Sequence, residues 1–115
     1  MGPKIVFLIR SNPNKSHRPD EAIRIATGLG IGKNPVKIIL SGEAPRMLSS
    51  SEEDMIDTDI IEKFLPLLEE WNVPLYVDKR SLGLVNLKGS PYNYRIADTE
   101  DTSELIAGGH YVFVF

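Results

Sequence analysis

The 115-residue chain contains no cysteine. Disulfide bonds, thiolate metal sites and a thiol nucleophile are therefore excluded, and the lack of disulfides fits a reducing compartment. No apolar run approaches the ~20 residues that a membrane-spanning helix needs. The first apolar segment begins at Ile5, which leaves no room for a signal peptide before it. We therefore expect a cytoplasmic protein.

The chain also has few histidines and a small net charge. The formal net charge is −3, which is too small to predict binding to nucleic acid or to an anionic membrane. The two histidines, His17 and His110, precede a helix and a strand that are far apart in the sequence. We expect them at opposite edges of a sheet, so they predict no shared metal site. No cofactor motif is present either.

Segments of strand type alternate with segments of helical periodicity along the whole chain. Expected strands cover 5–9, 36–40, 74–77, 92–97 and 111–115, and expected helices cover 19–29, 58–71 and 99–107. This alternation predicts a parallel sheet with right-handed connections and helices on both faces. The expected fold is a single α/β domain over residues 1–115, a flavodoxin-like three-layer sandwich whose five strands have the order 2-1-3-4-5.

The second expected helix carries the least regular signals. Asp57 or Thr58 is a good N-terminal cap, and the polar, acidic stretch 49–54 before it reads as an exposed loop. Pro66 lies inside the apolar pattern and predicts a kink or a break into two short helices. Helical spacing places Trp71 among the apolar residues that pack on the sheet.

Later in the chain, cap residues and an apolar end are the informative features. Ser81 is expected to cap a short helical stretch through residue 87, and Thr99 or Asp101 is expected to cap the last helix. The closing segment 111–115, YVFVF, is aromatic and β-branched throughout. An apolar strand at the end of a sheet needs a cover, so we expect self-association.

Basic residues concentrate in the loops that follow the expected strands. Six of the 13 Lys and Arg residues lie there, and parallel topology brings these loops to one edge of the sheet. This arrangement predicts a small-anion or nucleotide site. The candidate ligands are Arg10, Asn12, His17, Arg18, Arg46, Lys79 and Arg80. The simpler alternative is that these charges are solvated loop residues balanced by nearby acids.

Three catalytic or cofactor interpretations are weaker. The run G-L-G-I-G at 28–32 ends a helix, whereas a dinucleotide-binding glycine loop follows a strand and opens a helix. His17 as general acid or base, oriented by Asp78, needs the two side chains within hydrogen-bond reach. No nucleophile-elbow motif supports a serine hydrolase.

Three segments carry a family resemblance: K-I-V-F-L-I-R-S-N-P, R-P-D-E-A-I-R-I-A and V-P-L-Y-V-D-K-R-S-L. Their order and spacing resemble the DsrE/DsrF-like sulfur-relay family over nearly the whole chain. The resemblance implies a flavodoxin-like fold that assembles into trimers or hexamers. It also implies, in active members, a persulfide-carrying cysteine just after the third strand.

This chain departs from that pattern at the cysteine. Asp78 and Lys79 stand where the family's cysteine would lie, so persulfide sulfurtransferase chemistry is excluded on this chain. Family subunits without the cysteine act as structural partners of those that have it. The resemblance therefore implies an oligomeric structural or interaction subunit, either a homo-oligomer or a partner of a cysteine-bearing paralogue, rather than an enzyme. The anion-binding module remains the alternative.

Overall fold

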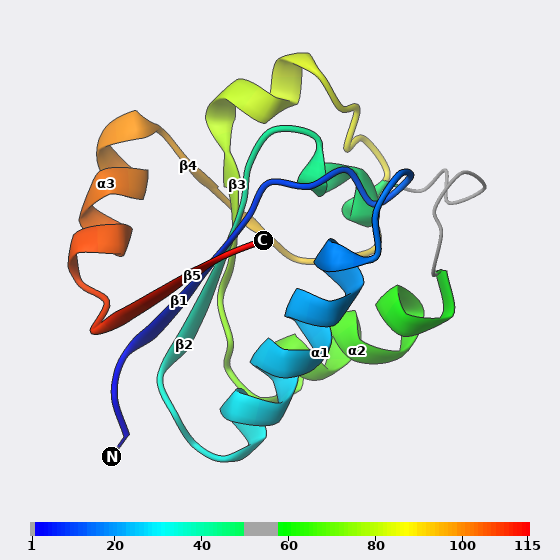
Figure 1. The fold of residues 1–115 in the computed structure, drawn as a ribbon. Helices are drawn as coiled ribbons and strands as arrows, with labels where there is room; N and C mark the ends of the chain where they lie inside the picture. Colours follow the sequence, from blue (N-terminus) through cyan, green and yellow to red (C-terminus); the bar gives the residue numbers. More distant parts are fainter. Residues whose placement is uncertain (1, 50–57) are drawn as a thin grey trace.

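Five parallel strands form one sheet, with helices on both of its faces (Figure 1). The computed structural model describes residues 2–49 and 58–115. The elements are β1 (Ile5–Ile9), α1 (Arg18–Ile31), β2 (Val36–Leu40), the 3₁₀ helix η1 (Ala44–Leu48), α2 (Thr58–Glu70), β3 (Leu75–Asp78), the 3₁₀ helix η2 (Lys79–Gly83), β4 (Arg95–Ala97), α3 (Thr99–Ala107) and β5 (Tyr111–Val114).

The strand order is β4-β3-β2-β1-β5. The α/β class and the five-stranded parallel sheet are confirmed, but the expected order 2-1-3-4-5 is wrong. The order 2-1-3 needs the first two helices on opposite faces, because right-handed connections on one face step in one direction. Here α1 and α2 pack side by side on the same face, so β1, β2, β3 and β4 follow one another across the sheet. The chain reverses only through α3, which crosses the other face and returns β5 to the side of β1 (Figure 1).

The main core lies between the sheet and the pair α1 and α2. Phe7, Ile38 and Val77 on three neighbouring strands are fully buried, and Ile23 and Ile61 meet them from the two helices. Burying a side chain of this size contributes about 1.5–3 kcal/mol. This layer fixes the central strands, and with them the positions of the loops at their carboxyl ends.

The other face has a thinner cover. The side chains of Val6 and Ile39 are buried there, but α3 contains no buried residue. Gly109, just after α3, lies so close to β1 that an added Cβ would stand 2.8 Å from Cγ2 of Val6. This close approach brings the chain from α3 directly into β5.

Two expectations for the second helix need correction. α2 is one helix that continues through Pro66, so the predicted break into two short helices is wrong, whereas the alternative of a kink at Pro66 stays a prediction. Trp71 is 41% exposed and does not pack on the sheet, because α2 ends at Glu70 and Asn72 takes a left-handed φ of 57°. The alternative helix start at Asp57, and the stretch 49–54 apart from Ser49, lie outside the described residues.

The caps and one strand also differ from expectation. Asp78, not Ser81, caps η2, which ends at Gly83. Asp98 caps α3 and forms a reciprocal capping box with Asp101, so the prediction of Thr99 or Asp101 as the cap is wrong. β4 begins at residue 95 rather than 92. In the part of the chain that the structure describes, no helix is long and apolar enough to cross a membrane.

Candidate functional site

An open hollow of about 680 Å³ lies at the carboxyl ends of β5, β1, β2 and β3. Open α/β sheets bind ligands at this edge, where the direction of the strand connections reverses. In this sheet the reversal falls between β1 and β5. Residues that follow each of the four strands line the hollow, and three of them are the arginines Arg10, Arg18 and Arg80.

Arg10 follows the last residue of β1. Its backbone N–H donates to the carbonyl oxygen of Phe115 at 2.7 Å, which ties the start of the loop to the end of β5. The Arg10 side chain is exposed. It makes no hydrogen bond or ion pair with another described residue, so its guanidinium is available to a ligand in the hollow.

Arg18 reaches the hollow from the first turn of α1. Its Nη2 donates to the carbonyl oxygen of Val114 at 3.3 Å. Its guanidinium carbon lies 5.7 Å from the centre of the Phe115 ring, within the range of a cation–π contact. The end of β5 therefore orients this arginine without neutralising its charge.

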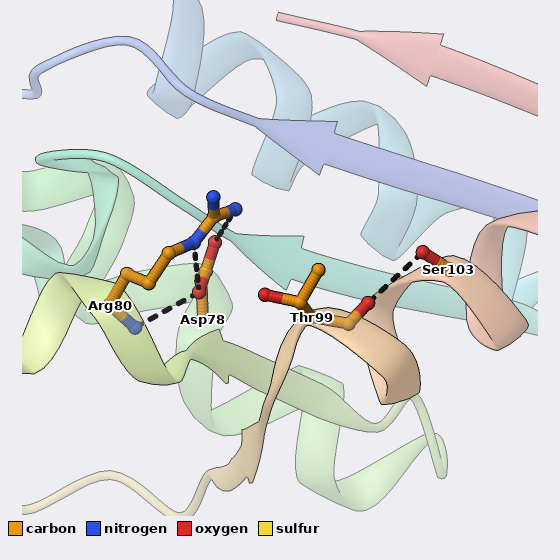
Figure 2. Close-up of polar contacts among 4 residues, drawn as sticks. All are labelled: Asp78, Arg80, Thr99 and Ser103. Carbon is orange, nitrogen blue, oxygen red and sulfur yellow. Dashed lines mark hydrogen bonds and ion pairs between the residues drawn. The ribbon is translucent and has the colours of Figure 1, made fainter.

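Asp78 and Arg80 form an ion pair at the end of β3 (Figure 2). The Nη2 and Nε atoms of Arg80 donate to the carboxylate at 2.9 and 3.3 Å, and the backbone N–H of Arg80 donates to it at 3.0 Å. The side-chain hydrogen bond from Arg80 is the largest of the effects that hold the pKa of Asp78 below its ordinary value. The same pairing raises the pKa of the Arg80 guanidinium. Both groups are charged at neutral pH.

Ser81, one residue further, has a buried hydroxyl. The residue is 2% exposed and lines the hollow. Among the described residues, its Oγ has no hydrogen-bond partner. A buried polar atom without a partner is uncommon in folded proteins, so this hydroxyl is an unused hydrogen-bonding group in the wall of the hollow.

Four of the seven predicted anion ligands lie outside the hollow. Nδ2 of Asn12 donates to the Glu43 carboxylate at 2.7 Å, and Nη2 of Arg46 donates to its other oxygen at 3.0 Å. The Arg46 hydrogen bond is the main cause of the lowered pKa of Glu43. His17 immediately precedes α1 and Lys79 opens η2, both exposed, and neither lines the hollow.

Sequence reasoning missed the hydroxyl groups. Ser11, Ser41 and Ser81 line the hollow with the arginines, yet serine is too common in loops to signal a site by itself. The sequence signal that could have identified these serines is their position after expected strands. Ser41 directly follows β2, and Ser11 lies two residues beyond β1. Within residues 2–49 and 58–115, no three histidine or carboxylate side chains gather in a way that would hold a metal ion.

The structure is similar to the crystal structure of the YchN protein from E. coli. The TM-score is 0.83, and the match covers 99% of this chain and 100% of YchN. The fold is that of YchN. Sequence identity to YchN is 18%, so the likeness concerns the path of the backbone alone. No family model and no curated protein matches the sequence.

Proposed function

We propose that this chain is a cysteine-less, DsrE-like structural or interaction subunit that assembles through its edge strand β5. The observation that carries the proposal is the exposure of an entirely apolar strand. Tyr111, Val112, Phe113 and Val114 are 56%, 39%, 45% and 53% exposed. Monomeric soluble proteins rarely leave such a continuous apolar segment uncovered.

The backbone of β5 is also open on one side. In a parallel pair, every second residue directs its N–H and C=O to the neighbouring strand. The N–H groups of Tyr111 and Phe115 bond to β1, so Val112 and Val114 direct theirs away from the sheet. Arg18 occupies the carbonyl of Val114. The free edge is therefore centred on Val112.

The usual protections of an edge strand are missing here. Edge strands commonly carry lysine, proline or a bulge, whereas Y-V-F-V at 111–114 has no charge and no proline. Phe7 packs against Phe113 with ring centroids 5.5 Å apart, which holds this aromatic ring in place before any partner arrives. A preformed apolar edge favours association because little conformational freedom is lost on binding.

The partner that best fits this edge is a second copy of the same strand. Pairing two β5 strands about a two-fold axis is self-complementary and joins the two sheets into one. Trimers or hexamers, as the family resemblance implies, would need a further contact in addition. A cysteine-bearing paralogue with a similar last strand is the alternative partner, and the missing thiol assigns this chain the supporting role. Its cysteine-free composition is consistent with work in the cytoplasm.

Sedimentation analysis of edge variants tests the proposal. Val112→Lys places a charge at the centre of the β5 edge and should shift the assembly to the monomer. Ile96→Lys is the matched control, because Ile96 is 51% exposed on β4 at the opposite edge of the sheet. This control should keep the wild-type mass. Dissociation by Ile96→Lys with an intact Val112→Lys assembly would contradict the assignment to β5.

A further inference from the structure

We infer that the hollow at the carboxyl edge binds a small molecule through a phosphate or sulfate group, held by Arg10, Arg18 and Arg80. The inference does not depend on the proposed assembly. It rests on three observations: the charge of the hollow, a buried hydroxyl without a partner, and an apolar wall beside the charged one.

The charge of the hollow is the first observation. Among the described residues, three arginine side chains line it against one side-chain carboxylate, that of Asp78. The Arg10 side chain has no hydrogen-bond partner among the described residues, and the Arg18 guanidinium contacts the Val114 carbonyl and the Phe115 ring but no carboxylate side chain among them. Guanidinium groups match the oxygens of phosphate and sulfate geometrically and form charge-assisted hydrogen bonds with them. An excess of guanidinium groups around one hollow therefore favours an oxyanion over a neutral ligand.

Asp78 prepares the site rather than opposing it. The carboxylate engages Nε and Nη2 of Arg80, and Nη1 makes no hydrogen bond with another described residue. Arg80 is otherwise 74% exposed, so without Asp78 its side chain would sample many rotamers. The ion pair thus holds one guanidinium edge at the hollow before a ligand binds, which reduces the entropy lost on binding.

The hydroxyl of Ser81 is the second, independent observation. It is withdrawn from water and has no partner among the described residues, although it lies next to the arginine that Asp78 orients. In the folded chain, the Ser81 hydroxyl is therefore a hydrogen-bond donor without an acceptor among the described residues, and the preceding residue in the sequence is the positively charged Arg80. An oxyanion accepts hydrogen bonds from every direction, so one ligand group can satisfy both the hydroxyl and the guanidinium groups.

The size and the second wall of the hollow indicate the class of ligand. A volume of about 680 Å³ lies within the range typical of small-molecule sites. Leu84, Val114 and Phe115 form an apolar wall of the same hollow. A phosphate or sulfate monoester with an apolar or aromatic body uses both walls, whereas a free inorganic ion uses only the arginines.

Titration with three probes at constant ionic strength tests the inference. The probes are phenyl phosphate, inorganic phosphate and chloride. Binding of each probe is measured by calorimetry and by changes in amide chemical shifts. Saturable binding of phenyl phosphate, with shifts at residues 10, 81 and 115, is expected. Tighter binding of phenyl phosphate than of phosphate indicates an ester ligand, and equal affinity indicates the free ion. No saturable binding of either, or equal shifts with chloride, overturns the inference.

Arginine variants localise the site. Arg10→Gln should weaken binding by about tenfold, as the loss of a charge-assisted hydrogen bond implies. Arg24→Gln is the matched control, because Arg24 is exposed on α1 and does not line the hollow. It should change the affinity less than twofold. Equal weakening by both variants would show diffuse attraction to the surface and overturn the assignment.

Ser81→Ala separates a ligand contact from a structural role. The hydroxyl makes no hydrogen bond to a described residue, so its removal should leave the urea midpoint of unfolding unchanged or raised. The same variant should weaken phenyl phosphate binding several-fold. A lowered urea midpoint with unchanged affinity would assign Ser81 a structural role and remove it from the site.

Discussion

The carboxylate of Asp78 lies 2.9 Å from Nη2 of Arg80 and also accepts the backbone N–H of the same residue at 3.0 Å. Asp78 is the last residue of β3 and 3% exposed. One acid therefore ends a strand, caps η2 and orients an arginine at the hollow. It does so at the place where the DsrE/DsrF-like resemblance would put a cysteine.

The first prediction concerns pH. Because Arg80 holds the pKa of Asp78 below its ordinary value of 3.8, the pair stabilises the fold fully above about pH 4 and loses this contribution as the pH falls further. Asp78→Asn should therefore lower the free energy of unfolding at pH 7, and the difference from wild type should shrink towards pH 3. Urea unfolding at several pH values measures this. A difference that grows on acidification would contradict the sign of the shift.

Substitutions of Arg80 and of Asp78 should destabilise the fold to different extents. Arg80→Ala leaves a buried carboxylate without its cation, whereas Asp78→Asn leaves an arginine that is 74% exposed and can be solvated. An unsatisfied buried charge costs more than a lost hydrogen bond. We expect Arg80→Ala to lower the free energy of unfolding at pH 7, and by more than Asp78→Asn does. The reverse order in urea unfolding would show that Asp78 is solvated in solution.

Alanine substitutions at two glycines of α1 should change the free energy of unfolding in opposite directions. A Cβ added at Gly28 meets nothing within 4 Å, whereas one added at Gly30 would stand 2.7 Å from Cγ2 of Val73, which is buried. Gly28→Ala should raise the free energy of unfolding by about 0.5–1 kcal/mol through helix propensity. Gly30→Ala should lower it, because the clash outweighs the same gain. Equal stabilisation by both would mean that the packing of α1 against Val73 is loose.

The cap of α3 gives a further test. Asp98 accepts the backbone N–H of Asp101 at 2.8 Å, and Asp101 accepts that of Asp98 at 3.1 Å. Asp98→Ala should therefore cost about 1 kcal/mol in urea unfolding. Thr99→Ala is the control. Its backbone carbonyl accepts the Ser103 hydroxyl at 3.0 Å (Figure 2), and this bond does not need the threonine side chain. A larger loss from Thr99→Ala would restore Thr99 as the cap.

Local patterns predicted the elements well, and the strand order poorly. The strands at 5–9 and 36–40 were expected at the residues where they occur, because uninterrupted apolar runs of that length suit buried parallel strands. The order depends on which face each helix covers. α1 and α2 both carry an apolar stripe, and nothing in either stripe says that they share a face.

The candidate site was predictable only in part, for a related reason. Charge and position identified Arg10, Arg18 and Arg80, which line the hollow. That Glu43 binds Asn12, 31 residues away in the sequence, depends on where η1 lies relative to the loop after β1. The position of such a loop cannot be predicted from the sequence, because loop residues follow no periodic pattern. Anion binding by the seven predicted residues stays a prediction.

The molar mass of the wild-type chain in solution tests the central claim most directly. Size-exclusion chromatography with light scattering at micromolar concentration should give a multiple of the 12.8 kDa chain mass, and Val112→Lys should lower it to one chain. A wild-type mass of 12.8 kDa throughout that range, with no partner retained on purification from the native host, would contradict assembly through β5.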